Sequence, residues 1–160
     1  MSQRTSQEPP DGPDRRGLAT QHASAALSPG LLLWRVTNRW QAAQRAALKP
    51  FGLTHVQFVL LASLTYLGRN GPISQRQLAD HAATDRMMTS QVLRALEQRG
   101  LVRRKDDPAD ARAKAITATT AGAALANQAV VAVEQCDAGF FAALDDPPGF
   151  IRALTALTAT

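Results

Sequence analysis

Apolar side chains recur every three or four positions through most of this chain, the spacing that places them on one face of an α-helix. In the first such stretch they are Leu32, Val36, Trp40, Ala43 and Ala47. Ser28 followed by Pro29 suits a helix start, because a serine caps free amides and a proline at the first helical position loses no needed donor. The pattern predicts a helix from Ser28 to about Leu48, which Pro50 then ends.

Two reciprocal capping pairs mark the next helix starts, since each pair satisfies backbone amides that a helix leaves free. The pairs are Thr54 with Gln57 and Ser74 with Gln77. They predict one helix from Thr54 to near Gly68 and a short one from Gln75 to about His81. The first of these has apolar residues on more than one face, so we expect it to run through the centre of the protein.

A third start signal at Thr84 predicts an amphipathic helix from Asp85 to Arg99, stopped by Gly100. The helical spacing sets an apolar side against a polar side. We expect the inner side to hold Met88, Val92, Ala95 and Leu96. The outer side then holds Arg86, Ser90, Arg94 and Gln98.

Alternating and β-branched residues near 101–105 and 113–117 flank a charged stretch at 106–110, which predicts a hairpin. Helix returns at Thr119 and Thr120 and runs to about Phe141, and prolines after Asp146 open a last short helix. The fold class is therefore mainly α with a small β-hairpin. Residues 1–27 are rich in proline and polar side chains and predict a disordered tail.

Composition narrows the class of protein. The chain has 160 residues, a net charge of +5 and one cysteine, Cys136, so it has no internal disulfide and no cysteine-based metal site. Its three histidines, His22, His55 and His81, are too scattered for a metal cluster. No long apolar segment or signal peptide is present, so we expect a cytoplasmic protein without cofactors.

The order of predicted elements points to duplex DNA. A short helix, a turn, an amphipathic helix and a basic hairpin form the arrangement that places one helix in the major groove and a wing beside it. Residues 69–114 carry ten Lys and Arg against six Asp and Glu. No nucleophile with a base and no phosphate loop appears, so an enzyme is not expected. The rival interpretation is a winged-helix protein-interaction module without DNA binding.

The same region resembles the MarR family of winged helix-turn-helix transcriptional regulators, and the resemblance covers roughly residues 28–160. Its most specific part runs from Leu96 to Arg112. The matching residues, in order, are Gly52, Leu53, Thr54, Gln57, Leu78, Ala79, Leu96, Glu97, Gly100, Leu101, Val102, Arg104, Asp107, Pro108, Asp110, Arg112, Thr119 and Gly122.

This resemblance implies a ligand-responsive regulator, expected to be a repressor, that acts as a homodimer on a palindromic operator. Residues 28–49 and 119–160 would form the dimerisation helices, and 53–118 the winged helix-turn-helix. It also implies that Arg112 enters the minor groove, held by Asp110. The other interpretation is that these two side chains only pair across a solvated turn.

Residues on the reading helix present donors and acceptors to base edges, because arginine suits guanine and glutamine suits adenine. They are Arg86, Ser90, Gln91 and Arg94. We expect phosphate contacts from Ser74, Gln75 and Arg76 at the start of the bracing helix, because helix N-termini attract anions, and a further contact from Arg104 in the wing. A hydrated helix face, or contact with phosphates alone, remains open for each.

A small aromatic or anionic effector is expected between the dimer helices and the DNA-reading domain, a location that the family resemblance supplies. The sequence offers apolar walls in Trp34, Trp40 and Phe58. Polar partners for a carboxylate or phenolate are Arg35, Arg39 and His55. The alternative is that both tryptophans lie in the dimer core and the arginines are solvated.

Overall fold

The computed structural model describes residues 17–106 and 114–159. The chain divides into two compact units, Met1–Val36 and Thr37–Thr160. In the first unit the described residues form a short 3-10 helix and the first turns of α1. Most of the predicted tail, residues 1–16, lies outside the described residues.

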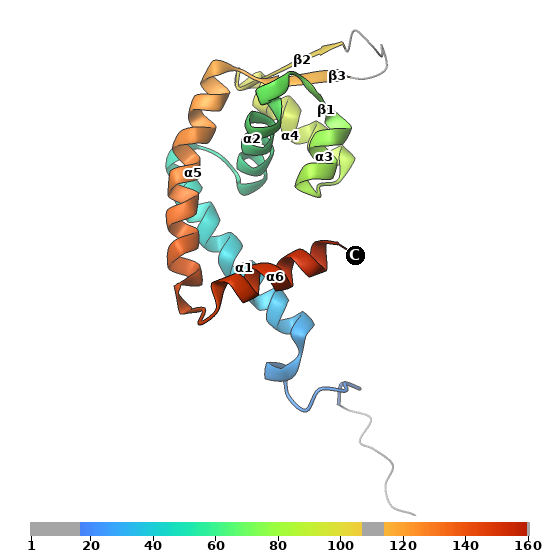
Figure 1. Ribbon diagram of the computed structural model, residues 1–160. Helices are drawn as coiled ribbons and strands as arrows, with labels where there is room; N and C mark the ends of the chain where they lie inside the picture. The colour runs from blue at the N-terminus through green and yellow to red at the C-terminus, as the bar shows by residue number, and fades with distance from the viewer. Residues whose placement is uncertain (1–16, 107–113, 160) are drawn as a thin grey trace, which may run out of the picture. The chain divides into compact units, whose positions relative to one another are not determined.

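Six α-helices are present among the described residues (Figure 1). They are α1 (Pro29–Leu48), α2 (His55–Leu67), α3 (Gln75–Ala82), α4 (Arg86–Gln98), α5 (Thr120–Phe140) and α6 (Pro147–Thr158). Short 3-10 helices, η1 (Ala25–Leu27), η2 (Lys49–Phe51), η3 (Gly68–Asn70) and η4 (Phe141–Ala143), lie between or before them. Each α-helix predicted from the sequence is present within one or two residues of its expected bounds.

The capping pairs act as the sequence predicts. Thr54 accepts from the backbone N–H of Gln57 at 3.2 Å, and the Gln57 side chain accepts from the Thr54 N–H at 3.0 Å. Ser74 and Gln77 repeat this exchange at 3.2 and 2.8 Å. The helix starts of α2 and α3 are therefore fixed by local chemistry.

The sheet has three antiparallel strands in the order β1-β3-β2, where the sequence predicts only a two-stranded hairpin. Strands β2 (Val102–Asp106) and β3 (Lys114–Ala118) form the hairpin, with Arg104 opposite Ile116. Strand β1 (Ile73–Ser74) adds to its far side through β3. A strand of two residues is too short to show alternation in the sequence.

Helix α2 occupies the centre of the second unit, as its apolar faces predict. Its residues Leu60, Leu61 and Leu64 are fully buried. They join a core cluster from α3, α4 and β3 that includes Leu78, Leu93, Leu96 and Ile116.

Among the described residues no single helix combines the length and apolar character needed to cross a membrane. The pair Pro29–Phe51 and His55–Asn70 meets these two criteria only when both segments are taken together, and it is bent by 72° at the break between them.

The inner face of α4 differs from the sequence prediction. Its buried residues are Thr89, Leu93 and Leu96, whereas Met88, expected inside, is 40% exposed. Leu93 and Thr89 are both absent from the inner side that the sequence predicts, and Thr89 is polar. Its hydroxyl, however, donates to the backbone oxygen of Asp85 at 2.7 Å, so it is buried with its polar group satisfied. The helix is therefore rotated from the expected orientation.

The start of α5 packs closely against the turn between α4 and β2. Thr119 caps α5 by accepting from the Gly122 N–H at 3.0 Å, and its hydroxyl donates to the Gly100 carbonyl at 2.7 Å. The Thr119 N–H donates to the Leu101 carbonyl at 3.0 Å. A Cβ added at Gly122 would lie 2.0 Å from that same carbonyl oxygen, so only glycine permits this approach.

Candidate DNA-binding surface

One outward stripe runs along α4. Met87, Gln91, Arg94 and Gln98 are all exposed, and their spacing of three or four residues places them on one helix face. Of the expected outer residues, Arg94 and Gln98 lie in this stripe, as does Gln91. Arg86 is exposed at the first turn, whereas Ser90 is only half-exposed at the margin. The sequence prediction missed Met87, which the rotation of α4 places opposite the core.

The first turn of α4 is held in place by three hydrogen-bonded links. Asp85 is the N-cap and accepts from the backbone N–H groups of Met87 and Met88 at 2.9 and 3.0 Å. The hydroxyls of Thr84 and Thr89 lie 2.8 Å apart. The Gln75 side chain of α3 donates to the Arg86 carbonyl at 3.3 Å. The two helices of the motif are thus joined at the end where the stripe begins.

The three residues expected to contact phosphates lie together at the start of α3, but they are not equally free. The Ser74 hydroxyl caps the helix, and the Gln75 side chain is bonded to α4. Arg76 is exposed and forms only a surface ion pair with Asp80 at 3.6 Å. Surface pairs of this kind contribute little, so the Arg76 guanidinium is the most available group of the three.

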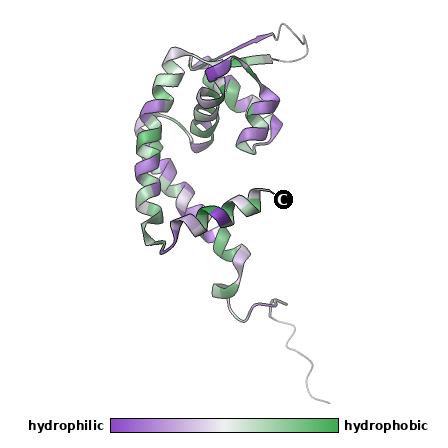
Figure 2. Ribbon diagram, viewed as in Figure 1, coloured by the Kyte–Doolittle hydropathy of each residue, from purple (hydrophilic) through white to green (hydrophobic). Residues whose placement is uncertain are grey.

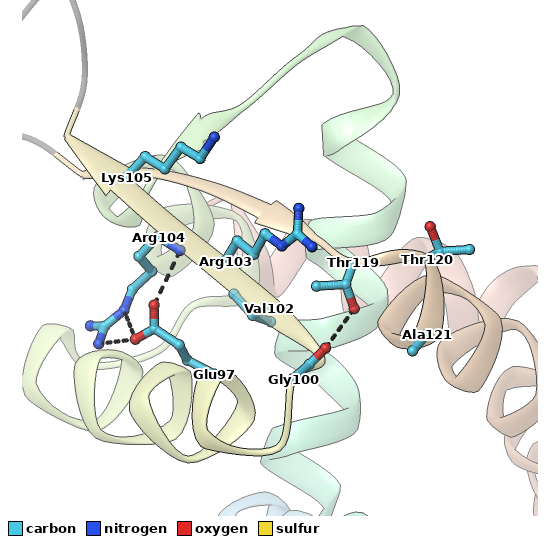
Figure 3. Close-up of a pocket in the computed structure, with 9 residues that line it drawn as sticks. All are labelled: Glu97, Gly100, Val102, Arg103, Arg104, Lys105, Thr119, Thr120 and Ala121. Atoms are coloured by element: carbon cyan, nitrogen blue, oxygen red, sulfur yellow. Dashed lines mark hydrogen bonds and ion pairs between the residues drawn. The ribbon is translucent and has the colours of Figure 1, made fainter.

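Strand β2 divides its three basic side chains between two faces (Figure 3). Arg104 turns toward α4, where its guanidinium donates to Glu97 at 2.8 and 2.5 Å. Arg103 and Lys105 point away from Glu97 and are exposed. Both contribute to the lining of a pocket of about 590 Å³, which Glu97, Arg104, Thr119 and Thr120 also line. Alternation along a strand is the signal that could have separated Arg104 from its two neighbours.

Figure 2 shows β2 as largely hydrophilic, in contrast to the apolar α2 beneath the sheet. The exception in β2 is its first residue, Val102, which is buried. The wing therefore presents charge rather than apolar surface. The expected wing-tip residues, Asp110 and Arg112, lie outside the described residues. Their proposed pairing and groove contact stay predictions.

The predicted effector residues fall into different surroundings. Trp40 and His55 lie together, with ring centroids 5.0 Å apart and nearly perpendicular. Phe58 is buried in the core. Arg39 is exposed, and Trp34 and Arg35 are exposed residues of the first unit.

Asp137 of α5 joins this group and was not foreseen. Its carboxylate oxygen Oδ1 accepts from the Trp40 indole at 2.7 Å and from the Gln44 amide at 2.6 Å. Gln44 is fully buried, and its own oxygen Oε1 has no hydrogen-bond partner among the described residues. The neighbourhood in which the sequence led us to expect an anionic ligand thus contains a carboxylate of the chain itself.

Burial lowers the pKa of His55 below its ordinary value of 6.5, an effect that the Asp137 carboxylate opposes and Arg45 reinforces. The neutral imidazole is therefore favoured in the folded chain. His55 is accordingly better suited to hydrogen bonding than to pairing with an anion at neutral pH.

A second groove of about 430 Å³ lies along α2, α3 and α5. Tyr66 stacks on His81 with ring centroids 6.3 Å apart, and the Arg69 guanidinium lies 4.9 Å from the Tyr66 ring. The sequence assigned none of these three residues to a binding site. Within the described part of the chain, no group of three or more His, Cys, Asp or Glu could hold a metal ion.

Comparison with known proteins gives consistent results. The MarR family model matches residues 53–114. The uncharacterized HTH-type transcriptional regulator YdcH of Bacillus subtilis is 40% identical over 131 residues, covering 81% of this chain and 89% of its own length. The HTH-type transcriptional repressor Rv2887 of Mycobacterium tuberculosis is 36% identical over 118 residues, covering 74% and 83%.

Solved structures of the same fold match most of the chain. CouR from Rhodococcus jostii bound to p-coumaroyl-CoA is 27% identical with a TM-score of 0.74, covering 86% of this chain and 93% of that one. BpsR of Bordetella bronchiseptica, regulated by 6-hydroxynicotinic acid, is 28% identical with a TM-score of 0.74, covering 84% and 93%. The regulator MOSR of M. tuberculosis in complex with DNA is 28% identical with a TM-score of 0.70, covering 81% and 92%. The chain belongs to the MarR family of DNA-binding transcriptional regulators, and it is not an enzyme.

Proposed function

We propose that the chain is a homodimeric, ligand-responsive repressor that binds a palindromic operator with α4 in the major groove. The observation that carries this proposal is the exposed stripe of α4, whose first turn is locked to α3 and whose polar members are Gln91, Arg94 and Gln98. No acidic residue interrupts that stripe. The name of the related mycobacterial repressor and the DNA complex of MOSR support the same function.

In this proposal the wing contacts the duplex beside the major groove. Exposed Arg103 and Lys105 supply positive charge along β2, and Arg112 enters the minor groove. An arginine is favoured there because a narrow groove concentrates negative potential. Arg104 contributes indirectly, since its pairing with Glu97 fixes β2 against α4. Since chromosomal DNA is the proposed partner, we place the protein in the cytoplasm.

The apolar surface of the terminal helices supports a homodimer built from residues 28–49 and 119–160. None of the described residues of α6 is buried, although the helix is largely apolar (Figure 2). Its exposed apolar residues are Ile151, Leu154 and Leu157. In the first unit the exposed apolar residues of α1 are Leu31, Leu32, Leu33, Trp34 and Val36. Apolar surface of this kind marks an interaction site, and a twofold dimer is the commonest arrangement.

Substitutions in the stripe and the wing should weaken DNA binding in different ways. Gln91→Ala or Arg94→Ala should cost about 1 to 3 kcal/mol on the preferred operator and little on other sequences, because each removes base-edge hydrogen bonds. Arg112→Ala should weaken binding to all duplexes, because its positive charge is attracted to the negative potential of any duplex and forms no hydrogen bond to a particular base edge. The measurement is titration of duplexes selected from a random pool, against scrambled duplexes of the same length.

Arg152→Ala of α6 is the matched control, since it removes one positive charge outside the stripe and the wing, on the side of α6 opposite Ile151, Leu154 and Leu157. Selected sequences should contain two inverted half-sites about 10 base pairs apart. If no duplex is enriched and binding shows no salt dependence, the chain is a protein-interaction module instead. If Arg112→Ala leaves both affinities unchanged, the wing assignment is wrong.

We further propose that a small aromatic acid binds beside Trp40 and His55 and weakens DNA binding. The named ligands of CouR and BpsR, p-coumaroyl-CoA and 6-hydroxynicotinic acid, support an aromatic effector. Because the Asp137 carboxylate lies at this place, a ligand there should offer a hydrogen-bond donor toward Asp137 and direct its acid group away from it. The partner that we propose for the acid group is the exposed Arg39. Hydroxylated aromatic acids meet both requirements.

A panel of hydroxybenzoates and hydroxynicotinates should quench tryptophan fluorescence and release DNA at the same concentrations. The ligand must prefer the conformation with weaker DNA affinity, since equal affinity for both states shifts nothing. Arg39→Gln should weaken the acids but not their uncharged amides. DNA release without a change in tryptophan fluorescence would move the site elsewhere, for example to the Tyr66 groove. No response to any compound would remove effector control at this place.

A further inference from the structure

The outward stripe of α4 contains one apolar side chain, Met87, among polar ones. Met87 is 71% exposed, more than any other large apolar residue that the structure describes in the second unit. It precedes Gln91 by one helical turn and lies on the same face as Arg94. A methionine there contributes nothing to the core, which α4 joins through Thr89, Leu93 and Leu96 on its other side.

The backbone of Met87 is also held in place by hydrogen bonds. Its backbone N–H donates to the Asp85 cap at 2.9 Å, and the preceding residue, Arg86, accepts from Gln75 of α3 at 3.3 Å. Only the side chain is free to move. The methionine side chain is flexible and unbranched, so it can adjust its conformation to contact an apolar group of a ligand. Its Cα stays in place because the backbone is held by these hydrogen bonds.

The neighbours of Met87 identify its partner. An apolar patch for a protein would continue along the helix, but the next positions of the stripe are Gln91 and Arg94, which suit polar base edges. The major groove offers one apolar group among its donors and acceptors, the C5-methyl of thymine. Since Met87 lies one turn before Gln91, it would reach a base pair near the one that Gln91 contacts.

We propose that Met87 is a specificity-determining residue that selects a thymine in each operator half-site through its C5-methyl group. The inference rests on the proposed DNA contact of α4. Met88, which is 40% exposed and lies off the stripe, has no such role.

The test removes the methyl group without changing any hydrogen bond. In the duplex selected from the random pool, each thymine is replaced in turn by deoxyuridine, and Kd is measured for the wild-type chain, Met87→Ser, Met87→Leu and Met88→Ser. At one thymine position of each half-site, replacement by deoxyuridine should lower the affinity of the wild-type chain about three- to fivefold. This is the value expected when one methyl group is removed from contact. Met87→Ser changes both protomers, so it should bind the thymine duplex about as weakly as the wild type binds a duplex that carries uracil at this position in both half-sites.

The decisive result is the coupling between protein and DNA changes. Met87→Ser should be insensitive to uracil at that position, whereas Met87→Leu and Met88→Ser should keep the wild-type loss. Equal uracil sensitivity in the wild type and Met87→Ser overturns the inference, as does a wild type indifferent to every uracil, while the DNA-binding proposal then still stands. Failure to enrich any duplex overturns both.

Discussion

Gly122→Ala should lower the free energy of unfolding by about 3 kcal/mol or more, at the upper end of what overpacking costs. The added Cβ would lie 2.0 Å from the Leu101 carbonyl oxygen and 2.9 Å from its carbon. Both are backbone atoms, so no side-chain rotation relieves the clash. The first turn of α5 would have to leave Leu101, which breaks the hydrogen bonds of Thr119 to Gly100 and Leu101.

The same helix supplies the matched control. Gly139 also lies in α5, but nothing comes within 4 Å of a Cβ built there. Gly139→Ala should therefore raise stability by about 0.5 to 1 kcal/mol, because alanine favours helix over glycine. Both variants should be unfolded with urea at one protein concentration, since a dimer's stability depends on concentration. Equal effects at the two glycines would show that the close approach at Gly122 does not exist.

Ile151→Glu should convert the chain to a monomer and reduce operator affinity by more than about 100-fold. The substitution places a charge on the exposed apolar side of α6 that we assign to the dimer interface, where burying an unpaired carboxylate is strongly unfavourable. Two half-sites bound by separate chains lose the advantage of linked binding. Sedimentation velocity at micromolar concentration measures the first effect and titration of the operator the second.

Ala156→Glu is the control for this change. It adds the same charge to α6, on the side opposite Ile151 and four residues after Arg152, where the two can pair. It should remain dimeric and bind DNA normally. Circular dichroism should show that both variants keep their helices. A dimer in Ile151→Glu would remove α6 from the interface.

Local chemistry explains why so much of the fold is predictable from the sequence. Thr54, Ser74 and Thr119 each satisfy amides within three residues of themselves, so the helix starts depend on short stretches of sequence. The central position of α2 follows from its apolar faces. Strand β1 does not follow, because its two residues become a strand only by pairing with β3, some forty positions along the chain.

The candidate site was harder to predict than the helices. Thr89 was assigned to neither side of α4, although its hydroxyl is satisfied within its own helix and the residue is buried. Leu93, which is fully buried, was also absent from the expected inner side. The two omissions together rotated the expected face, so Met87 was not recognised as an outward residue. The contact of Asp137 with Trp40 joins residues 97 positions apart, and no periodic pattern connects them. Side chains that meet only through tertiary packing leave little trace in one sequence.

The pairing of Arg104 with Glu97 has a consequence for the duplex itself. It fastens the wing strand to the reading helix with hydrogen bonds of 2.8 and 2.5 Å. In the DNA complex that we propose, α4 and the wing are therefore held at a fixed separation, and they fit only DNA whose major and minor grooves are separated by the same distance. Groove spacing varies with base sequence, so in that complex base pairs that neither α4 nor the wing contacts still affect the binding affinity.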